Sequence, residues 1–262
     1  MKLKYGFVTT IKGGIIGVGF AIPFISLGAL VAAIGLFDLV IDAICNFFKD
    51  IKKNTFVLVP LIIGVALGFI AGSNIMKYLY NDYNCQIILF FVGLLMGCIP
   101  TFAKDIKKGK KLVGSILFFI IFSCFLIFSF VSNISFSINT NNMLFTIFYG
   151  IISGFVLLCP GFSEFLLSKL FGLTSFSSFL GNNNFTLVYL IGAFLGVILI
   201  CILFKFLYKK PWIDYVLLSL ILSSVVLMLL SIGSFTVNFT TIFTSILTFL
   251  WGFLLSRKIR EE

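Results

Sequence analysis

The sequence predicts an all-α polytopic membrane protein made of two inverted repeats, each with a re-entrant helical hairpin and three transmembrane helices. Its composition gives the first reason: 60% of the 262 residues are apolar and only 11% are charged, whereas soluble domains carry about 25% charged residues. Short lysine clusters separate long apolar runs, and two of these runs contain a central proline. We therefore expect a single membrane domain over residues 1–262, without room for a soluble domain.

Six apolar segments are long enough to cross a bilayer as simple helices, because a crossing needs about 20 apolar residues. They are 55–73, 85–102, 112–132, 185–208, 213–232 and 239–256.

Two longer apolar regions, 12–47 and 144–180, are broken near their middle by Pro23 and Pro160. Each region predicts two half-helices that meet at an irregular break. Irregular backbone is tolerated at membrane depth only inside protein or beside a cavity. The breaks are therefore candidates for the interior of the molecule.

The lysine clusters predict the topology, because basic residues favour the cytoplasmic side. Clusters at 49–53, 104–111, 205–210 and 257–260 would all be cytoplasmic, as would both chain ends. The loops around 133–143, 174–184 and 233–238 carry no basic residue and would lie outside. Region 12–47 then begins and ends on the cytoplasmic side, and region 144–180 begins and ends outside. The net charge of +10 is thereby assigned to topology and anionic lipid headgroups, and not to nucleic acid.

An internal repeat relates the two broken regions. Pro23, Ser26, Gly35 and Leu36 align without gaps on Pro160, Ser163, Gly172 and Leu173. At a second offset, Gly64, Gly68, Lys77, Leu79 and Tyr80 align on Gly192, Gly196, Lys205, Leu207 and Tyr208. The predicted repeats are residues 1–133 and 144–262. Each has three simple crossings, an odd number, so the second repeat is inverted. This architecture is typical of transporters with a site at the repeat interface.

The breaks contain the first candidate site residues. Pro23 and Pro160 end one half-helix each, and Ser26 and Ser163 stand where the next half-helix begins and can cap it. A helix start carries partial positive charge and unpaired donors, so it can hold a phosphate or a carboxylate. Two starts that enter from opposite faces can converge on one anion, and Gly28 and Gly161 would let the backbone approach it. The alternative is that Pro and Ser only shape two tight turns.

Charged residues near the breaks are further candidates, because ionisable groups inside the membrane are costly. Glu164 would compete with a bound phosphate unless protonated, which suggests proton coupling. Lys169 can meet the anion or extend to the outer interface. Lys12 can meet a headgroup from the cytoplasmic side or serve as a topology signal. Asp38 and Asp42 can line a polar path, although an approach to the cytoplasmic interface explains both.

Enzymatic signatures are not found in the sequence. Histidine is absent, and the six cysteines are scattered without a CxxC pair. No phosphate-binding P-loop, zinc spacing or nucleophile–histidine pair occurs. We predict no metal, no cofactor and no enzymatic activity.

Four short segments resemble the bacterial polyprenyl-phosphate translocases, the PopT-type proteins, formerly a family of unknown function. Residues 22–28 (IPFISLG) and 34–36 (IGL) resemble its first signature, which is close to PGVSGG. Residues 90–100 (FFVGLLMGCIP) resemble its FFxGLxxGxIP segment, and residues 159–163 (CPGFS) resemble the start of its second signature, PGISGS. Phe24 and Leu27 replace glycines of the first signature, and Glu164 and Phe165 replace Gly and Ser of the second.

The resemblance implies a function and its location. The family returns undecaprenyl phosphate from the outer to the inner leaflet of the bacterial plasma membrane, for reuse in cell-wall and surface-polymer synthesis. The implied partners are this lipid and the surrounding membrane lipids. Two alternatives stay open. One is an undecaprenyl-diphosphate phosphatase, whose Pro-Gly-x-Ser-Arg-Ser signature residues 160–163 partly match. The other is a transporter of small anions.

Overall fold

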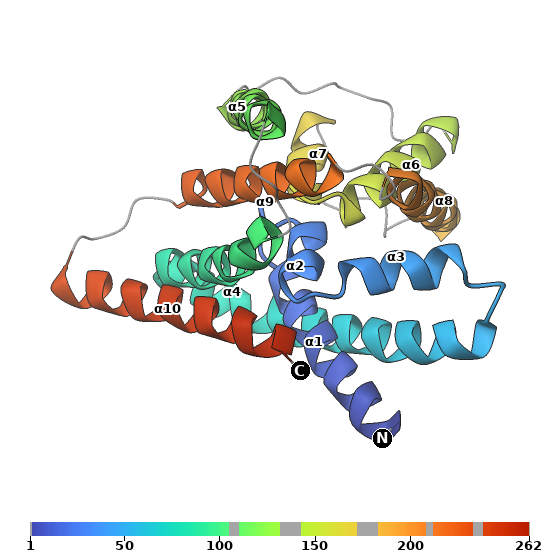
Figure 1. The fold of residues 1–262 in the computed structure, drawn as a ribbon, viewed down its shortest axis with the longest axis horizontal. Coiled ribbons are helices and arrows are strands. Elements are labelled where there is room, and N and C mark those ends of the chain that lie inside the picture. Colours follow the sequence, from blue (N-terminus) through green and yellow to red (C-terminus); the bar gives the residue numbers. More distant parts are fainter. Residues whose placement is uncertain are drawn as a thin grey trace.

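The fold is a bundle of helices, seen in a computed structural model that describes residues 2–104, 110–131, 143–171, 183–207, 212–232 and 238–261 (Figure 1). These residues form helices without any strand, which confirms the all-α prediction. The helices are α1 (Lys2–Phe20), α2 (Leu27–Ala33), α3 (Phe37–Cys45), α4 (Ile51–Lys104), α5 (Lys110–Val131), α6 (Met143–Leu158), α7 (Glu164–Leu170), α8 (Asn183–Leu207), α9 (Ile213–Leu230) and α10 (Phe239–Glu261).

The first broken region contains three helical pieces, and not the two half-helices that the sequence predicts. α1 runs from Lys2 to Phe20, through the glycines that follow Lys12, and the chain breaks at Pro23 as expected. A second break follows at Gly35, whose φ of 78° is open to glycine at little cost. There the axes of α2 and α3 bend by 111°. The bend returns the chain toward the start of α4.

The two predicted crossings 55–73 and 85–102 are both present in α4, as the spans Ile51–Ile75 and Asp82–Pro100, and a kink at Tyr83 joins them. α4 extends from Ile51 to Lys104 and departs from helical geometry only at Tyr83, with φ −124° and ψ 28°. No glycine or proline stands between Ser73 and Tyr83, so the residues that connect the two spans are helical up to the kink. We call Ile51–Ile75 and Asp82–Pro100 the first and second half of α4.

Five helical segments of the described residues are long and apolar enough to cross a membrane, or six if α2 and α3 count as one bent span. They include both halves of α4 together with α8, α9 and α10, and α5 has a shorter apolar stretch. The chain is therefore a multi-pass membrane protein. In the second broken region, α6 and α7 flank Pro160. The rest of the predicted hairpin, from residue 172 to 180, lies outside the described residues.

Backbone-to-backbone contacts between glycines join α1 to the first half of α4. A Cβ on Gly13 would lie 2.5 Å from the carbonyl oxygen of Leu61, and one on Gly64 would lie 2.2 Å from that of Thr10. Small residues allow such close helix packing in membranes. Gly17 follows Gly13 along α1 and meets α4 further along, so the two helices run in the same direction and begin on the same side.

The pair formed by α6 and α8 repeats this interface. Gly150 and Gly192 approach each other as Gly13 and Gly64 do, and Gly150 also meets the carbonyl of Tyr189. These positions are related by the same two offsets that align Pro23 with Pro160 and Gly64 with Gly192 in the sequence. The contacts therefore recur at the positions that the predicted duplication requires.

The two remaining long helices, α10 and α5, each pack on a helix of the other predicted repeat. α10 lies along the second half of α4, where Cys85 contacts Ser245 at 3.7 Å between Sγ and Oγ. Further along both helices, a Cβ on Gly97 would meet the carbonyl of Phe253 at 2.7 Å, so they run parallel. α5 packs on α9, and Ser123 and Ser223 share a hydrogen bond of 3.1 Å. Thus α10 of the second predicted repeat packs on the first repeat, and α5 of the first repeat packs on the second.

The end of α8 lies beside the beginning of α4. Nζ of Lys205 donates to Oδ1 of Asn46 at 2.7 Å, and Nδ2 of Asn54 donates to the backbone oxygen of Asn46 at 2.7 Å. Phe37 and Phe204 also pack with their ring centroids 5.1 Å apart. α8 therefore ends near the side from which the first half of α4 starts.

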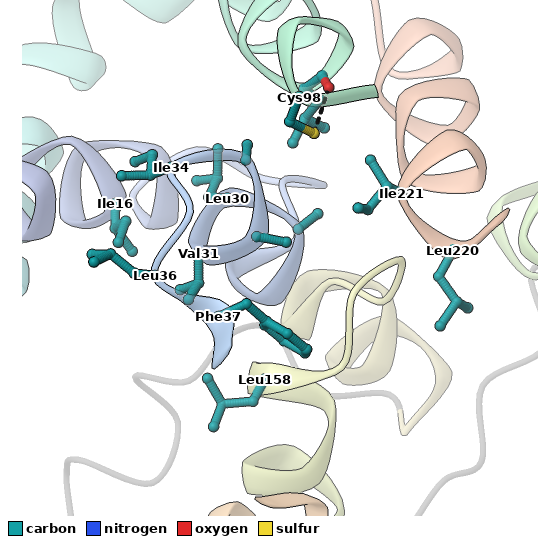
Figure 2. Close-up of a cluster of buried hydrophobic side chains, with 14 of the residues drawn as sticks. Ile16, Leu30, Val31, Ile34, Leu36, Phe37, Cys98, Leu158, Leu220 and Ile221 are labelled. Carbon is teal, nitrogen blue, oxygen red and sulfur yellow. Dashed lines mark hydrogen bonds between the residues drawn. The ribbon is translucent and has the colours of Figure 1, made fainter. Parts of the chain in front are cut away.

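The buried core surrounds the short helix α2. Residues 28–33 are all buried, although this helix is too short to cross a membrane. Figure 2 shows Leu30 and Val31 of α2 gathered with Leu158 at the end of α6 and Leu220 of α9. Burial among these apolar side chains holds the first break in the middle of the bundle.

Candidate functional site

Each break starts a short helix that a serine caps. Oγ of Ser26 accepts the backbone N–H of Ala29 at 3.3 Å, and Oγ of Ser163 accepts that of Leu166 at 3.3 Å. Both serines have extended backbone, as N-cap residues do. The capping that the sequence predicts at these two positions is therefore present.

The two breaks touch each other. The backbone N–H of Gly161 donates to Oγ of Ser26 at 3.1 Å, and that hydroxyl donates to the carbonyl of Cys159 at 3.3 Å. Gly28 lies so close that a Cβ on it would be 2.4 Å from the carbonyl oxygen of Leu158. Ser26, Gly28 and Gly161, all predicted site residues, thus form one contact together with the backbone around Pro160.

Ser26 is fully engaged within the protein in this conformation. Its hydroxyl accepts two N–H groups, donates to one carbonyl and is 1% exposed. A hydroxyl has one donor hydrogen and two acceptor lone pairs, so no bonding capacity is left. A ligand can reach Ser26 only if the breaks separate.

A hollow of about 170 Å³ lies beside this contact, between the first break and α7. Pro23, Ser163 and Glu164 line it, so it unites three of the predicted site residues. Its remaining lining is mostly apolar and is formed by Phe20, Ala21, Ile22, Phe24, Ile25, Phe69, Phe165 and Ser168. Phe69 and Phe165 are 38% and 40% exposed. The hollow therefore opens to the outer, apolar surface of the helices.

Glu164 is held by two hydroxyl groups from neighbouring helices. Oγ of Ser153, on α6, and the hydroxyl of Tyr189, on α8, each donate to Oε1 of Glu164 at 3.1 Å. The two hydroxyl oxygens are also 2.6 Å apart. The carboxyl oxygen of Glu164 and the two hydroxyl oxygens thus form a triangle in which each oxygen is within hydrogen-bonding distance of the other two.

The two predicted lysines lie away from the hollow. Nζ of Lys169 donates to the carbonyl of Phe130 at 2.5 Å and lies 5.4 Å from the centre of its ring, at the end of α5. Lys12 precedes Phe20 by eight residues on α1, which is about 12 Å along a helix. Neither lysine lines the hollow, so the structure does not bring them to the predicted anion.

Four polar or aromatic residues near the site were missed by sequence reasoning. Ser153 and Tyr189 hold Glu164, and Phe69 and Ser168 line the hollow. Ser153 and Tyr189 are polar residues within long apolar runs, and such residues in transmembrane helices usually face a neighbouring helix. That signal marks them as interior but does not identify their partner.

A second cavity of about 740 Å³ lies where α3 meets the start of α4. Asp38 and Asp42 line it, and both are exposed. Its other lining residues are Leu39, Ala43, Asp50, Lys52, Lys53, Asn54, Phe56 and Val57. The two aspartates therefore belong to a separate opening, and they do not contribute to the hollow at the breaks.

Comparison with known proteins gives the family. A family model described as VCA0040-like, undecaprenyl phosphate translocase-like, matches residues 7–230. The chain belongs to this family. The match begins in α1 and ends at α9, so it includes both breaks and Glu164.

A curated relative of this translocase-like protein supports the same assignment. The polyprenyl-phosphate transporter of Staphylococcus aureus (strain NCTC 8325 / PS 47) is 26% identical over 102 residues, which is 38% of this chain. That match spans 36% of the transporter's own length. No solved structure matches the chain.

Proposed function

We propose that this protein carries polyprenyl phosphate from the outer to the inner leaflet of the bacterial plasma membrane, for reuse of the carrier lipid. The family and the curated relative support polyprenyl phosphate as the substrate. The observation that carries the proposal is the contact of the two breaks, Ser26 with Gly161, beside a small hollow. The phosphate would otherwise cross about 30 Å of hydrocarbon unaided.

The hollow is the proposed headgroup site. Ser163, Glu164 and Ser168 provide polar groups on one wall, and the first break provides the other. Because Phe69 and Phe165 are partly exposed, a headgroup can enter from the side while its polyprenyl tail stays in lipid. The exposed apolar surface continues outside the hollow, at Ile70, which is 61% exposed.

Separation of the breaks would expose the groups that hold them together. The N–H of Gly161 and the hydroxyl of Ser26 now bind each other. Both can donate to a phosphate oxygen, and bonds from donors to an anion are stronger than those between neutral groups. A phosphate can therefore replace the contact that closes the site.

An inverted repeat gives this exchange a route to alternating access. The glycine interfaces of α1 with α4 and of α6 with α8 use corresponding positions. The end of α8 lies beside the start of α4, and this contact supports a proposed arrangement in which corresponding helices point in opposite directions. We infer that the two halves alternate as inner and outer gates around the breaks.

Proton coupling would act through Glu164. Its triangle with Ser153 and Tyr189 has three contacts but only two hydroxyl hydrogens. One additional proton on the carboxyl group completes the ring of hydrogen bonds. The neutral acid also removes the repulsion between a carboxylate and a phosphate in the same hollow. We propose that a proton enters with the lipid.

A leaflet-resolved assay in proteoliposomes tests the function. The outer-leaflet fraction of polyprenyl phosphate is followed over time for the wild type, for Ser26→Leu with Ser163→Leu, and for Ser73→Leu. We expect the double variant to fall to the protein-free rate, because leucine can neither cap the short helices nor bind an anion. Ser73, bonded to Ile70 near the end of the first half of α4, is the control and should retain transport.

Three other outcomes would contradict the proposal. Full activity of the double variant would refute the proposed site. Release of phosphate from polyprenyl diphosphate by the purified protein would indicate a phosphatase. Flux of a soluble anion without lipid movement would indicate a small-anion transporter.

A further inference from the structure

Two aromatic rings face each other across the proposed headgroup site. Phe24, in the first break, and Phe165, in the first turn of α7, both line the hollow. Their ring centroids are 4.5 Å apart and the planes meet at 61°, the edge-to-face geometry that aromatic pairs favour. Phe24 also packs on Phe130 of α5, at 5.3 Å. The pair therefore joins the two walls of the hollow.

The backbone at Phe24 is unfavourable for a residue with a side chain. Its φ is +68°, and it is the one non-glycine residue with positive φ in the described part of the chain. Gly161 occupies the aligned position of the second break, immediately after Pro160, and also has positive φ, at 100°. The left-handed conformation is costly for a residue with a Cβ. Strained residues of this kind concentrate at ligand sites. The ring of Phe24 is therefore a candidate for a role in the headgroup site.

The size of the hollow suggests that role. Its volume of about 170 Å³ is smaller than the roughly 300 Å³ at which pockets for drug-sized ligands begin. A single phosphate leaves part of this volume free. A longer headgroup that extends toward the first break or α7 would meet the rings of Phe24 and Phe165, which line the hollow there.

We propose that the Phe24–Phe165 pair is a size filter that admits a phosphate monoester and excludes the corresponding diphosphate. The inference rests on the proposed headgroup site and adds the residues that set its selectivity. A second phosphate would have to part the rings and lie against their apolar faces. Phosphate charge is poorly solvated there, so the larger headgroup is rejected on both size and charge.

Two variants separate the ring from the backbone strain. Phe24→Gly removes the ring and the strain, and Phe24→Leu keeps bulk at the same backbone. Phe165→Ala opens the filter from the other wall, without altering the first break. Phe128→Ala is the control, because Phe128 is a 62% exposed phenylalanine of α5 that does not line the hollow.

The measurement is the ratio of translocation rates for polyprenyl phosphate and polyprenyl diphosphate in proteoliposomes. We expect the wild type to favour the monophosphate. Phe24→Gly and Phe165→Ala should each lower the ratio by about tenfold, the factor that the stronger aromatic pairs represent, through faster movement of the diphosphate. Phe24→Leu should change it less, and Phe128→Ala should leave it unchanged.

The outcomes distinguish the filter from the function. If the wild type moves the monophosphate but both opened variants keep its ratio, the filter is refuted and the proposed function stands. If the wild type moves neither lipid, the proposed function fails and the filter fails with it. Thermal melting of each detergent-purified variant shows whether it is folded. If Phe24→Gly is unfolded, the ratio of translocation rates measured for Phe165→Ala alone tests the size filter.

Discussion

Glu164 is a carboxyl group on the wall of a hollow that is proposed to receive phosphate. Its partners Ser153 and Tyr189 are neutral hydroxyl groups, and the lysine of the same short helix, Lys169, is bonded elsewhere, to the carbonyl of Phe130. The hydrogen-bond partners of this carboxyl group within the described residues are therefore uncharged. Proton uptake is then the simplest way for this residue and a phosphate to share the site.

Replacement of Glu164 by glutamine tests whether transport depends on proton uptake by this carboxyl group. Wild-type transport should increase as the pH falls, because the protonated acid does not repel the phosphate. Glu164→Gln resembles the neutral acid and should transport at a rate that varies little with pH, because the amide does not ionise. The rates are measured in proteoliposomes at a series of symmetrical pH values.

Asp38→Asn is the control for this experiment. Asp38 is also acidic but lines the separate cavity near the start of α4, so its variant should keep the wild-type dependence on pH. A steep dependence that persists in Glu164→Gln would show that the proton is taken up elsewhere.

At the residue scale, the sequence predicts the features that depend on neighbouring residues in the chain. Pro23 and Pro160 stop helices and Ser26 and Ser163 cap them, because proline geometry and capping act within a few residues. The bonds of Glu164 to Ser153 and Tyr189 could not be predicted, since they depend on how α6, α7 and α8 pack.

Among the elements, parallel packing of α10 on the second half of α4 joins the two predicted repeats. Apolar length alone predicts that these helices exist but not which helices are neighbours. The two crossings in α4 were predicted from apolar length, but their connection through helical residues and a kink at Tyr83 was not. The backbone contact of Gly97 with Phe253 and the contact of Cys85 with Ser245 define the pairing.

A disulfide tests the pairing of these elements. Cys85 Sγ lies 3.7 Å from Ser245 Oγ, so Ser245→Cys should form a disulfide after a small shift, since an S–S bond is about 2.0 Å long. The other five cysteines are replaced by alanine, and a protease site is inserted between α5 and α6. After oxidation and cleavage, the two fragments should migrate together until a reductant is added.

Ile246→Cys is the matched control for the disulfide. Ile246 follows Ser245 but is 54% exposed, because adjacent helical residues point in directions about 100° apart. It should yield separate fragments. Separate fragments from Ser245→Cys as well would contradict the parallel pairing.

The whole molecule should place the starts of α1 and α4 on one side of the membrane. Gly13 and Gly17 meet successive turns of α4, so these helices enter the bilayer together, and the region between them returns to its side of entry. The same holds for α6 and α8. With α8 ending beside Asn46, the two pairs would enter from opposite faces.

Cysteine labelling in intact cells tests this arrangement. Phe7 and Phe48 are 67% and 89% exposed, and Met143 and Phe239 are 63% and 83% exposed. In a cysteine-free background, an impermeant thiol reagent should label Met143→Cys and Phe239→Cys but not Phe7→Cys or Phe48→Cys. Inside-out vesicles should reverse the pattern. Labelling of Phe7→Cys and Phe48→Cys from opposite sides would exclude a re-entrant first region.

The pairing of α10 with α4 also affects how the chain is made. Cys85 and Ser245 are separated by 160 residues, and ribosomes add roughly 5–20 residues per second. The face of α4 that includes Cys85 and Gly97 therefore lacks its partner, α10, for on the order of ten seconds or more after it has entered the bilayer. During synthesis, lipid or an insertion chaperone must cover that face, and the first half of the protein cannot reach its final packing until the second half has been translated.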